Sequence, residues 1–192
     1  MRIWLTRKKQ NTTPSTGEPD VTEGWLHPES AQTLLAETTR QQLIQFIRQS
    51  TALPASLFER FWLIPIHRFA ELAQLFPASE NHHHSHAGGL LDHSLEAACY
   101  AARLRQSYLF PPDAAPEDQA AQSERWTTVI IYAALLHDLG KLITDIEVEN
   151  FSGKRWFPWH GPLTQPYRFR YLPQRDYLRH PAAAVLLLTQ LI

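Results

Sequence analysis

The sequence of 192 residues has one cysteine, almost no net charge and no long apolar run. Because Cys99 has no second cysteine to pair with, the chain forms no internal disulfide, which suits a reducing cytoplasm. A formal net charge of -1 gives no overall basic field that would demand nucleic acid as a partner, so any such contact must come from a local patch. No run of about 18 apolar residues is present, and the start MRIWLTRKKQ lacks the apolar core of a signal peptide. We therefore expect a cytoplasmic protein with no membrane partner.

Apolar residues make up 44% of the sequence and charged residues 19%, which predicts a globular chain with a core large enough for one domain. Residues 8–24 are rich in Thr, Pro and Gly, so we take residues 1–24 as a flexible lead-in and 25–192 as one helical domain. The sequence stops in PAAAVLLLTQLI, an apolar helix without a capping glycine or a basic last turn. This ending leads us to expect the N-terminal part of a longer protein.

The fold class predicted from the pattern is all-α with one small β-hairpin. Apolar spacing and proline positions predict helices over residues 27–50, 54–76, 88–108, 125–140 and 181–192. We expect Pro28 at the first helical position and a break or kink at Pro65. The stretch DIEVENFSGKRWFPW alternates and has a Ser-Gly turn, which predicts the hairpin near residues 146–157. The aromatic stretch HGPLTQPYRFRYLPQRDY that follows is predicted to be irregular.

The helix predicted for residues 125–140 is apolar, yet it ends in two polar residues whose place needs an explanation. From Val129 to Leu136 its only polar side-chain atom is the Tyr132 hydroxyl, so we expect it to be buried on all sides, with Gly140 as its C-cap. Its last turn carries His137 and Asp138. A carboxylate at the end of an apolar helix must find a cation, a hydrogen-bond donor or a metal ion.

A metal ion is one explanation, and a capping or hydrogen-bonding role for the His-Asp pair is the other. His93 projects from an apolar surface of the helix predicted for residues 88–108, and it offers a third ligand beside His137 and Asp138. Two imidazoles and one carboxylate suit Mn, Fe, Co, Ni or Zn. The sequence therefore predicts one or two divalent transition-metal ions as cofactor.

The stretch AALLHDLGK, with GGLLDHSLEAA upstream, resembles the HD superfamily of metal-dependent phosphohydrolases. The resemblance implies an HD-like helical bundle with His93, His137 and Asp138 as metal ligands. In such a site the ion activates water for in-line attack on phosphorus, and we assign Asp138 and Lys141 to the catalytic set, Lys141 as a positive charge for the substrate phosphate. The alternative for Lys141 is a solvated lysine just past a helix end.

Other parts of the HD ligand set match this sequence less directly. The distal Asp of the family has no match, because Asp145 is very close to the His-Asp pair and Asp176 lies in a predicted loop. Some members of the superfamily hold a second ion with two further histidines. His160 and His180 match that interval and are predicted to bind a second metal, the alternative being surface-loop histidines.

A narrower resemblance is carried by FAELAQLFPASENHHHSHAGGLLDHSLEAA together with ALLHDLGK. These stretches resemble the N-terminal domain of MobH-type conjugative relaxases, the TraI-like proteins of integrating conjugative elements. The likeness covers residues 28–190 and includes Trp156, Pro158, Gly161, Leu163 and His180. It implies DNA processing at a transfer origin, other conjugation proteins as partners, and a metal site implicated in nicking.

Two groups of residues are candidates for contact with single-stranded DNA. One is the histidine cluster, His82, His83, His84 and His86, for which the alternative is a solvated polar linker. The other is a basic-aromatic segment near His160, comprising Lys154, Arg155, Trp156, Tyr167, Arg168, Arg170, Tyr171 and Arg175. Such segments suit single strands through base stacking and phosphate contact, and we place the contact on Arg168 and Arg170. A solvated loop with aromatic residues in the core is the alternative.

Three functions follow from these observations. The first is a metal-dependent DNA-processing domain with the phosphodiesterase or nickase chemistry of a relaxase. The second is an HD phosphohydrolase acting on a small nucleotide, and the third is a non-catalytic module that binds DNA or protein. An open groove lined by Arg168 and Arg170 would favour the first, a narrow deep pocket the second, and an incomplete ligand set the third.

Overall fold

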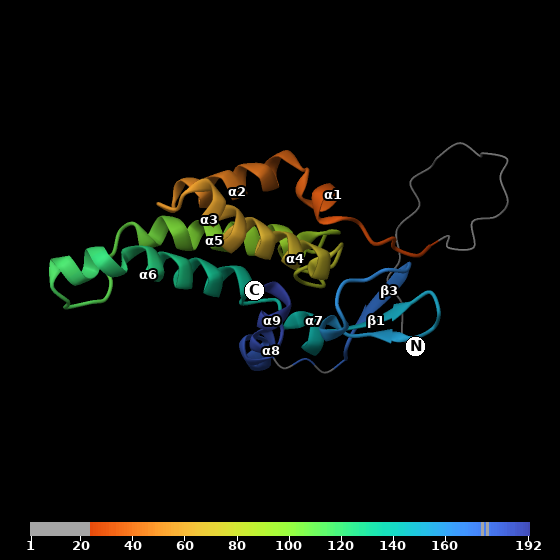
Figure 1. Cartoon of the computed structure of the whole chain (residues 1–192). Helices are drawn as coiled ribbons and strands as arrows, with labels where there is room; N and C mark the ends of the chain where they lie inside the picture. Colours follow the sequence, from red (N-terminus) through yellow and green to blue (C-terminus); the bar gives the residue numbers. More distant parts are fainter. Residues whose placement is uncertain (1–23, 174, 176) are drawn as a thin grey trace.

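The two longest helices, α5 (Gly89–Arg105) and α6 (Pro116–Leu136), lie side by side and are joined by residues 106–115, the tip loop (Figure 1). The computed structural model describes residues 24–173, 175 and 177–192. The predicted lead-in therefore lies outside the described residues, apart from Gly24. The described chain is mostly helical with one small sheet, which confirms the predicted helical class.

In chain order the other elements are α1 (Ala31–Leu35), α2 (Thr38–Gln49), α3 (Ala55–Phe58), the π-helical segment η1 (Glu59–Leu63), α4 (Ile64–Ala73), α7 (Lys141–Thr144), β1 (Ile146–Asn150), β2 (Arg155–Trp156), the 3-10 turn η2 (Pro158–His160), β3 (Tyr167–Tyr171), the 3-10 turn η3 (Tyr177–Arg179), α8 (His180–Leu186) and α9 (Leu188–Leu191). Helices α2 and α3 lie alongside α5, and the sheet, α7, α8 and α9 lie at the end of the pair away from the tip loop (Figure 1). The core links helices to sheet through Phe76, whose ring packs against Trp156, Tyr167 and Phe169.

Two helices, α1 and α2, replace the single helix predicted for residues 27–50, and that prediction was wrong. The Ser30 hydroxyl accepts a hydrogen bond from the Thr33 amide at 3.1 Å, so α1 begins after this cap rather than at Pro28. Glu37 then adopts an extended backbone with ψ of 134°, which separates the two helices. The break lets the first turn of α2 bring Arg40 against α5.

The kink predicted at Pro65 is a π-helical turn, and α3, η1 and α4 follow one another without a loop. Pro65 has no N–H to donate to the carbonyl of Phe61, four residues earlier. The hydroxyl of Tyr132 on α6 donates to that oxygen instead. Burial raises the pKa of Tyr132 to about 12, so the hydroxyl keeps the proton that it donates.

From Val129 to Leu136 helix α6 is apolar on every side but buried on one only, so the prediction of complete burial was wrong. Ile131 and Leu135 are buried in the core, whereas Val129 on the other side is 59% exposed. The open side faces α8 across an apolar groove of about 590 Å³, the α6–α8 groove, to which Phe61 and Val185 contribute. Among the described residues, Pro116–Thr144 is the one helical segment with the length and composition to cross a membrane, a test that core helices of soluble proteins also pass.

The sheet has three antiparallel strands in the order β2-β1-β3, one more than predicted. The hairpin of β1 and β2 lies where the alternating pattern placed it, but β3 forms in the stretch predicted to be irregular. That stretch also alternates, with Tyr167 and Phe169 buried and Arg168 and Arg170 half-buried. Prolines on both sides concealed a strand of only five residues.

Gly140 is not the C-cap that the sequence predicted. The helix ends at Leu136, and Gly140 has φ of −61°, an ordinary helical value. A Cβ atom at this position would lie 2.0 Å from the carbonyl oxygen of His180. The missing side chain therefore allows the start of α8 to pack directly against the turn that carries Asp138.

Candidate metal centre

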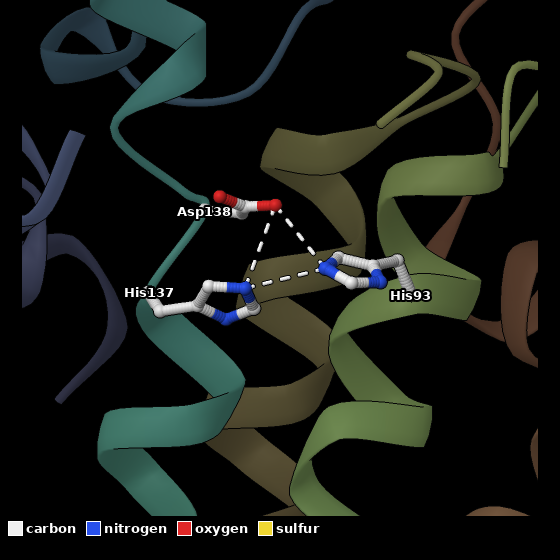
Figure 2. Close-up of side chains that lie close together, drawn as sticks. All are labelled: His93, His137 and Asp138. Carbon is white, nitrogen blue, oxygen red and sulfur yellow. Dashed lines mark hydrogen bonds and ion pairs between the residues drawn. The ribbon is translucent and has the colours of Figure 1, made fainter. Parts of the chain in front are cut away.

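Three side chains from two helices converge at the end of α6 (Figure 2). His93 comes from α5, and His137 and Asp138 follow directly after the last residue of α6. The Nε2 atoms of His93 and His137 are 3.2 Å apart. Oδ2 of Asp138 lies 3.2 Å from Nε2 of His93 and 3.5 Å from Nε2 of His137. The convergence predicted for these three residues is what the structure shows.

The chemistry of the donor atoms fits a divalent transition metal. One ligand atom from each residue lies within 4.8 Å of the other two. Nδ1 of His137 is 2.7 Å from the carbonyl oxygen of Ala134, and because a carbonyl only accepts, Nδ1 carries the proton. The lone pair of Nε2 is thereby directed at the other two ligand atoms, as in protein metal sites.

Asp138 is held in its ionised form. Burial opposes ionisation, but hydrogen bonds from His93 and Lys141 and the charge of Lys141 outweigh it, so the pKa of Asp138 lies well below its usual value. The Lys141 ammonium is 2.6 Å from Oδ2 of Asp138 and also donates to the carbonyl of Ala78 at 2.8 Å. Lys141, predicted to meet a substrate phosphate, thus lies against the carboxylate.

His180 lies behind Asp138, on the side away from the other two ligands. Its Nδ1 is 3.9 Å from Oδ1 of Asp138, and its Nε2 is 2.7 Å from Oδ1 of Asp145. Both His180 and Asp145 are buried, and Thr144 also bonds to Asp145. Sequence reasoning missed this pair, because nothing in the sequence connects two residues that lie 35 positions apart.

The structure does not bring His160 to the three converging residues. His160 lies at the end of η2, where its ring contacts Phe157 and Trp159. Within the described part of the chain the group holds three ligands. Asp145 is turned to His180 rather than to the group, and Asp176 lies outside the described residues.

The histidine cluster forms the loop that leads into α5. His82, His83 and His86 are exposed, whereas His84 is half-buried and its ring centroid lies 5.2 Å from that of His93. His84 and His86 contact carboxylates on α5: Nε2 of His84 is 3.2 Å from Glu96, and Nε2 of His86 is 2.9 Å from Asp92. Through His84, the cluster therefore borders the candidate metal centre.

The two arginines predicted to contact DNA are engaged on the sheet. Arg168 pairs with Glu149 at 2.9 Å, and Arg170 pairs with Glu147 at 2.6 Å. These cross-strand pairs partly neutralise the positive charge on which the prediction rested.

A cavity of about 390 Å³ adjoins the centre through Lys141. Leu90 and Leu142 contribute to its apolar wall, and Glu80 and Arg175 form an ion pair at 2.6 Å beside it. The Tyr171 hydroxyl, which also borders this cavity, has no hydrogen-bond partner among the described residues.

The fold and the site together define a class of protein. It is a mostly helical domain with a His-His-Asp group between the start of α5 and the end of α6. A family model, TraI_2, with the description "Putative helicase", matches residues 24–192. The chain belongs to this family, which confirms the TraI-like part of the resemblance. No curated protein matches the sequence.

Proposed function

We propose that the domain holds a divalent transition-metal ion with His93, His137 and Asp138 and acts on phosphodiester bonds of DNA during conjugative transfer. The observation that carries the proposal is the convergence of these three ligand atoms within 4.8 Å. The TraI_2 match and the resemblance to conjugative relaxases support DNA as the substrate and other conjugation proteins as partners. The HD-like assignment of the bundle and the MobH subfamily belong to the same proposal.

A bound divalent ion would supply Lewis-acid polarisation of a phosphoryl oxygen and a lowered pKa for the water it binds. The residues of this chain prepare the site for that ion. The Ala134 carbonyl fixes the tautomer of His137, and Lys141 keeps Asp138 ionised. Asp138 and Lys141 remain our candidates for catalytic residues, and His160 and His180 our candidates for a second ion.

Access to the centre favours a polymeric substrate. The side chains of His93 and His137 are 33% and 41% exposed, so a phosphate within a long chain can reach them from solvent. The histidine cluster borders the same opening and stays a proposed DNA contact, as do Arg168 and Arg170. We do not propose a helicase, because the sequence has no G-x-x-x-x-G-K-[ST] motif for a nucleoside triphosphate.

Hydrolysis of a small nucleotide is the second candidate function. The cavity of about 390 Å³ beside Lys141 has the size of a small-molecule site and favours it.

Elemental analysis of the purified protein, after reconstitution with Mn, Fe, Co, Ni or Zn, tests the proposal. For the group of His93, His137 and Asp138 we expect one ion per chain in the wild type, none in His137→Ala, and an unchanged content in His83→Ala, a matched loss of an exposed histidine outside the group. An ion at His160 and His180 would add a second equivalent. An ion bound only to the native state raises the free energy of unfolding by about 2.7 kcal/mol at 100 times its Kd, so thermal unfolding gives a second readout.

Activity assays then separate the functions. Metal-dependent cleavage of a labelled single-stranded oligonucleotide supports the proposal, and release of phosphate from mononucleotides alone supports the second candidate. A wild-type protein that takes up none of the five metals would refute the metal centre, and DNA binding without cleavage would leave a binding module.

A further inference from the structure

The solvent face of the sheet places acidic and basic side chains in register. Glu147 and Glu149 of β1 lie opposite Arg170 and Arg168 of β3, respectively. The ion pairs that they form, at 2.6 and 2.9 Å, occupy both carboxylates of this face of β1. Any further cation on this face therefore adds positive charge that these carboxylates do not balance.

Strand β2 and the turn before it supply two such cations. Arg155 lies opposite Glu149, whose carboxylate is already paired with Arg168, and Lys154 precedes it. Both are exposed, and neither makes an ion pair within the described residues. The edge of the sheet at β2 thus has a local excess of positive charge, although the whole chain is close to neutral.

A column of planar groups rises from the same edge. The guanidinium of Arg155 lies over the ring of Phe157 at 4.7 Å. The Phe157 ring stacks on that of Trp159, with centroids 4.7 Å apart and an interplanar angle of 12°. Trp159 is 43% exposed, so the column ends in an accessible indole.

The local backbone holds this column in place. Pro158 starts the 3-10 turn η2, and Gly161 ends it with φ of 88°, a value that favours glycine. The indole N–H of Trp156 donates to the carbonyl of Gly161 at 2.9 Å and ties the turn to the buried face of the sheet. A ligand that stacks on Trp159 therefore meets a largely pre-organised surface.

A polar cavity of about 360 Å³ lies beside the column. Lys154, Arg155 and His160 line it, together with the amide side chains of Asn150 and Gln165. No Asp or Glu lines it among the described residues. Cations and amide donors without a carboxylate are suited to a phosphate group.

We propose that the β2 platform, formed by Lys154, Arg155, Phe157, Trp159 and His160, binds single-stranded DNA. A phosphate occupies the cavity beside Lys154 and Arg155, and a neighbouring base stacks on Trp159. The proposal rests on the function proposed above, which makes DNA the substrate. It favours a single strand because a paired base in a duplex has no free face for an indole, and it favours nucleic acid over an acidic peptide because stacking needs a planar partner.

The test is fluorescence anisotropy with a labelled single-stranded oligonucleotide and the full chain in EDTA, so that binding is measured without the metal centre. We expect Trp159→Ala to weaken binding about 10-fold, within the range of about 1–3 kcal/mol per stacked base. Lys154→Ala with Arg155→Ala should weaken binding and reduce the slope of log K against log salt by about 1.4, since each phosphate contact on a single strand contributes about 0.7.

Arg60→Ala and Phe61→Ala are the matched controls, because Arg60 lies over the exposed ring of Phe61 at 5.4 Å on a different element. Both should bind as the wild type does, and a duplex of the same sequence should bind more weakly than the single strand. Wild-type affinity in the platform variants would overturn this assignment and leave the metal-dependent function standing. Absence of single-strand binding by the wild type at low salt would also overturn it. A protein that binds the single strand through the platform but takes up no metal would count only against the metal centre.

Discussion

At the scale of single residues, Asp138 has two carboxylate oxygens with different surroundings. Oδ2 faces His93, His137 and Lys141, all within 3.5 Å. Oδ1 faces the buried His180 at 3.9 Å. With one ion bound by His93, His137 and Asp138, His180 acts on the candidate centre through Asp138 and is a positioning residue.

We expect His180→Ala to lower metal affinity about 10-fold, the lower end of the effect of losing a group that orients a ligand. The same change leaves Asp145 buried without its imidazole and should reduce the free energy of unfolding by about 3 kcal/mol. Metal titration and urea unfolding measure the two effects, with His83→Ala, the loss of an exposed histidine outside the group, as control. Complete loss of metal, as expected for His137→Ala, would instead identify His180 as a ligand.

At the scale of elements, an arginine on α2 ties that helix to α5. Arg40 is 7% exposed, and its guanidinium contacts Asp92 at 2.6 and 3.1 Å. It also donates to the carbonyl of Leu34 in α1. Burial opposes ionisation of Asp92, but Arg40 and His86 outweigh it and hold its pKa below the usual value. The residue after Asp92 is His93, so this contact also fixes the helix turn that carries a ligand.

Arg40→Ala should reduce the free energy of unfolding by about 1–3 kcal/mol, because it removes the two-pronged contact and leaves the half-buried carboxylate of Asp92 with His86 as its remaining partner. Arg40→Lys should lose less, since it keeps the charge but not the two-pronged contact. Urea unfolding at neutral pH measures both. Arg125→Ala, the loss of an exposed arginine on α6, should stay within about 0.5 kcal/mol of the wild type, and an equally small loss for Arg40→Ala would contradict the prediction.

The contact between α6 and the π-helical turn predicts an alkaline effect. The pKa of Tyr132 is raised to about 12, against about 10 in the unfolded chain, so the folded state keeps this proton more tightly. Its contribution to stability is therefore complete below pH 10 and is lost as the pH rises toward 12. Unfolding curves between about pH 9 and 11 should fall less steeply for Tyr132→Phe than for the wild type. Parallel curves would contradict the prediction.

Elements with a strong local signal could be predicted from the sequence, and contacts between elements could not. The convergence of His93, His137 and Asp138 followed from an apolar helix that ends in a His-Asp pair and from a histidine on the apolar surface of a second helix. The exposure of one side of α6 could not be predicted. An apolar pattern shows that a side of a helix is suited to burial, but it does not show whether a neighbouring element covers that side. Gly140 was taken for a cap because the approach of His180, 40 residues later, leaves no trace in the local sequence.

At the scale of the whole molecule, the candidate centre and the β2 platform belong to different parts of the fold. The centre lies where α5 and α6 meet the sheet-bearing part, and the platform lies on the sheet itself (Figure 1). The centre combines side chains from elements distant in the sequence, α5 and the end of α6, whereas the platform lies within residues 154–160.

The tip loop between α5 and α6 makes the domain a candidate for fragment complementation. Residues 106–115 lie at the end of the molecule away from the candidate centre, with Tyr108 and Leu109 60% and 73% exposed, and they separate His93 from His137 and Asp138 (Figure 1). A protease site inserted there should, once cut, give two polypeptides that α5 and α6 hold together without a covalent link. Neither piece alone has the three ligands, so a stoichiometric metal site should return only on mixing the two, which elemental analysis of the isolated and recombined pieces would measure. Metal binding would then report the association of the two polypeptides. A single fragment that binds a full equivalent of metal would show that the ligands lie elsewhere.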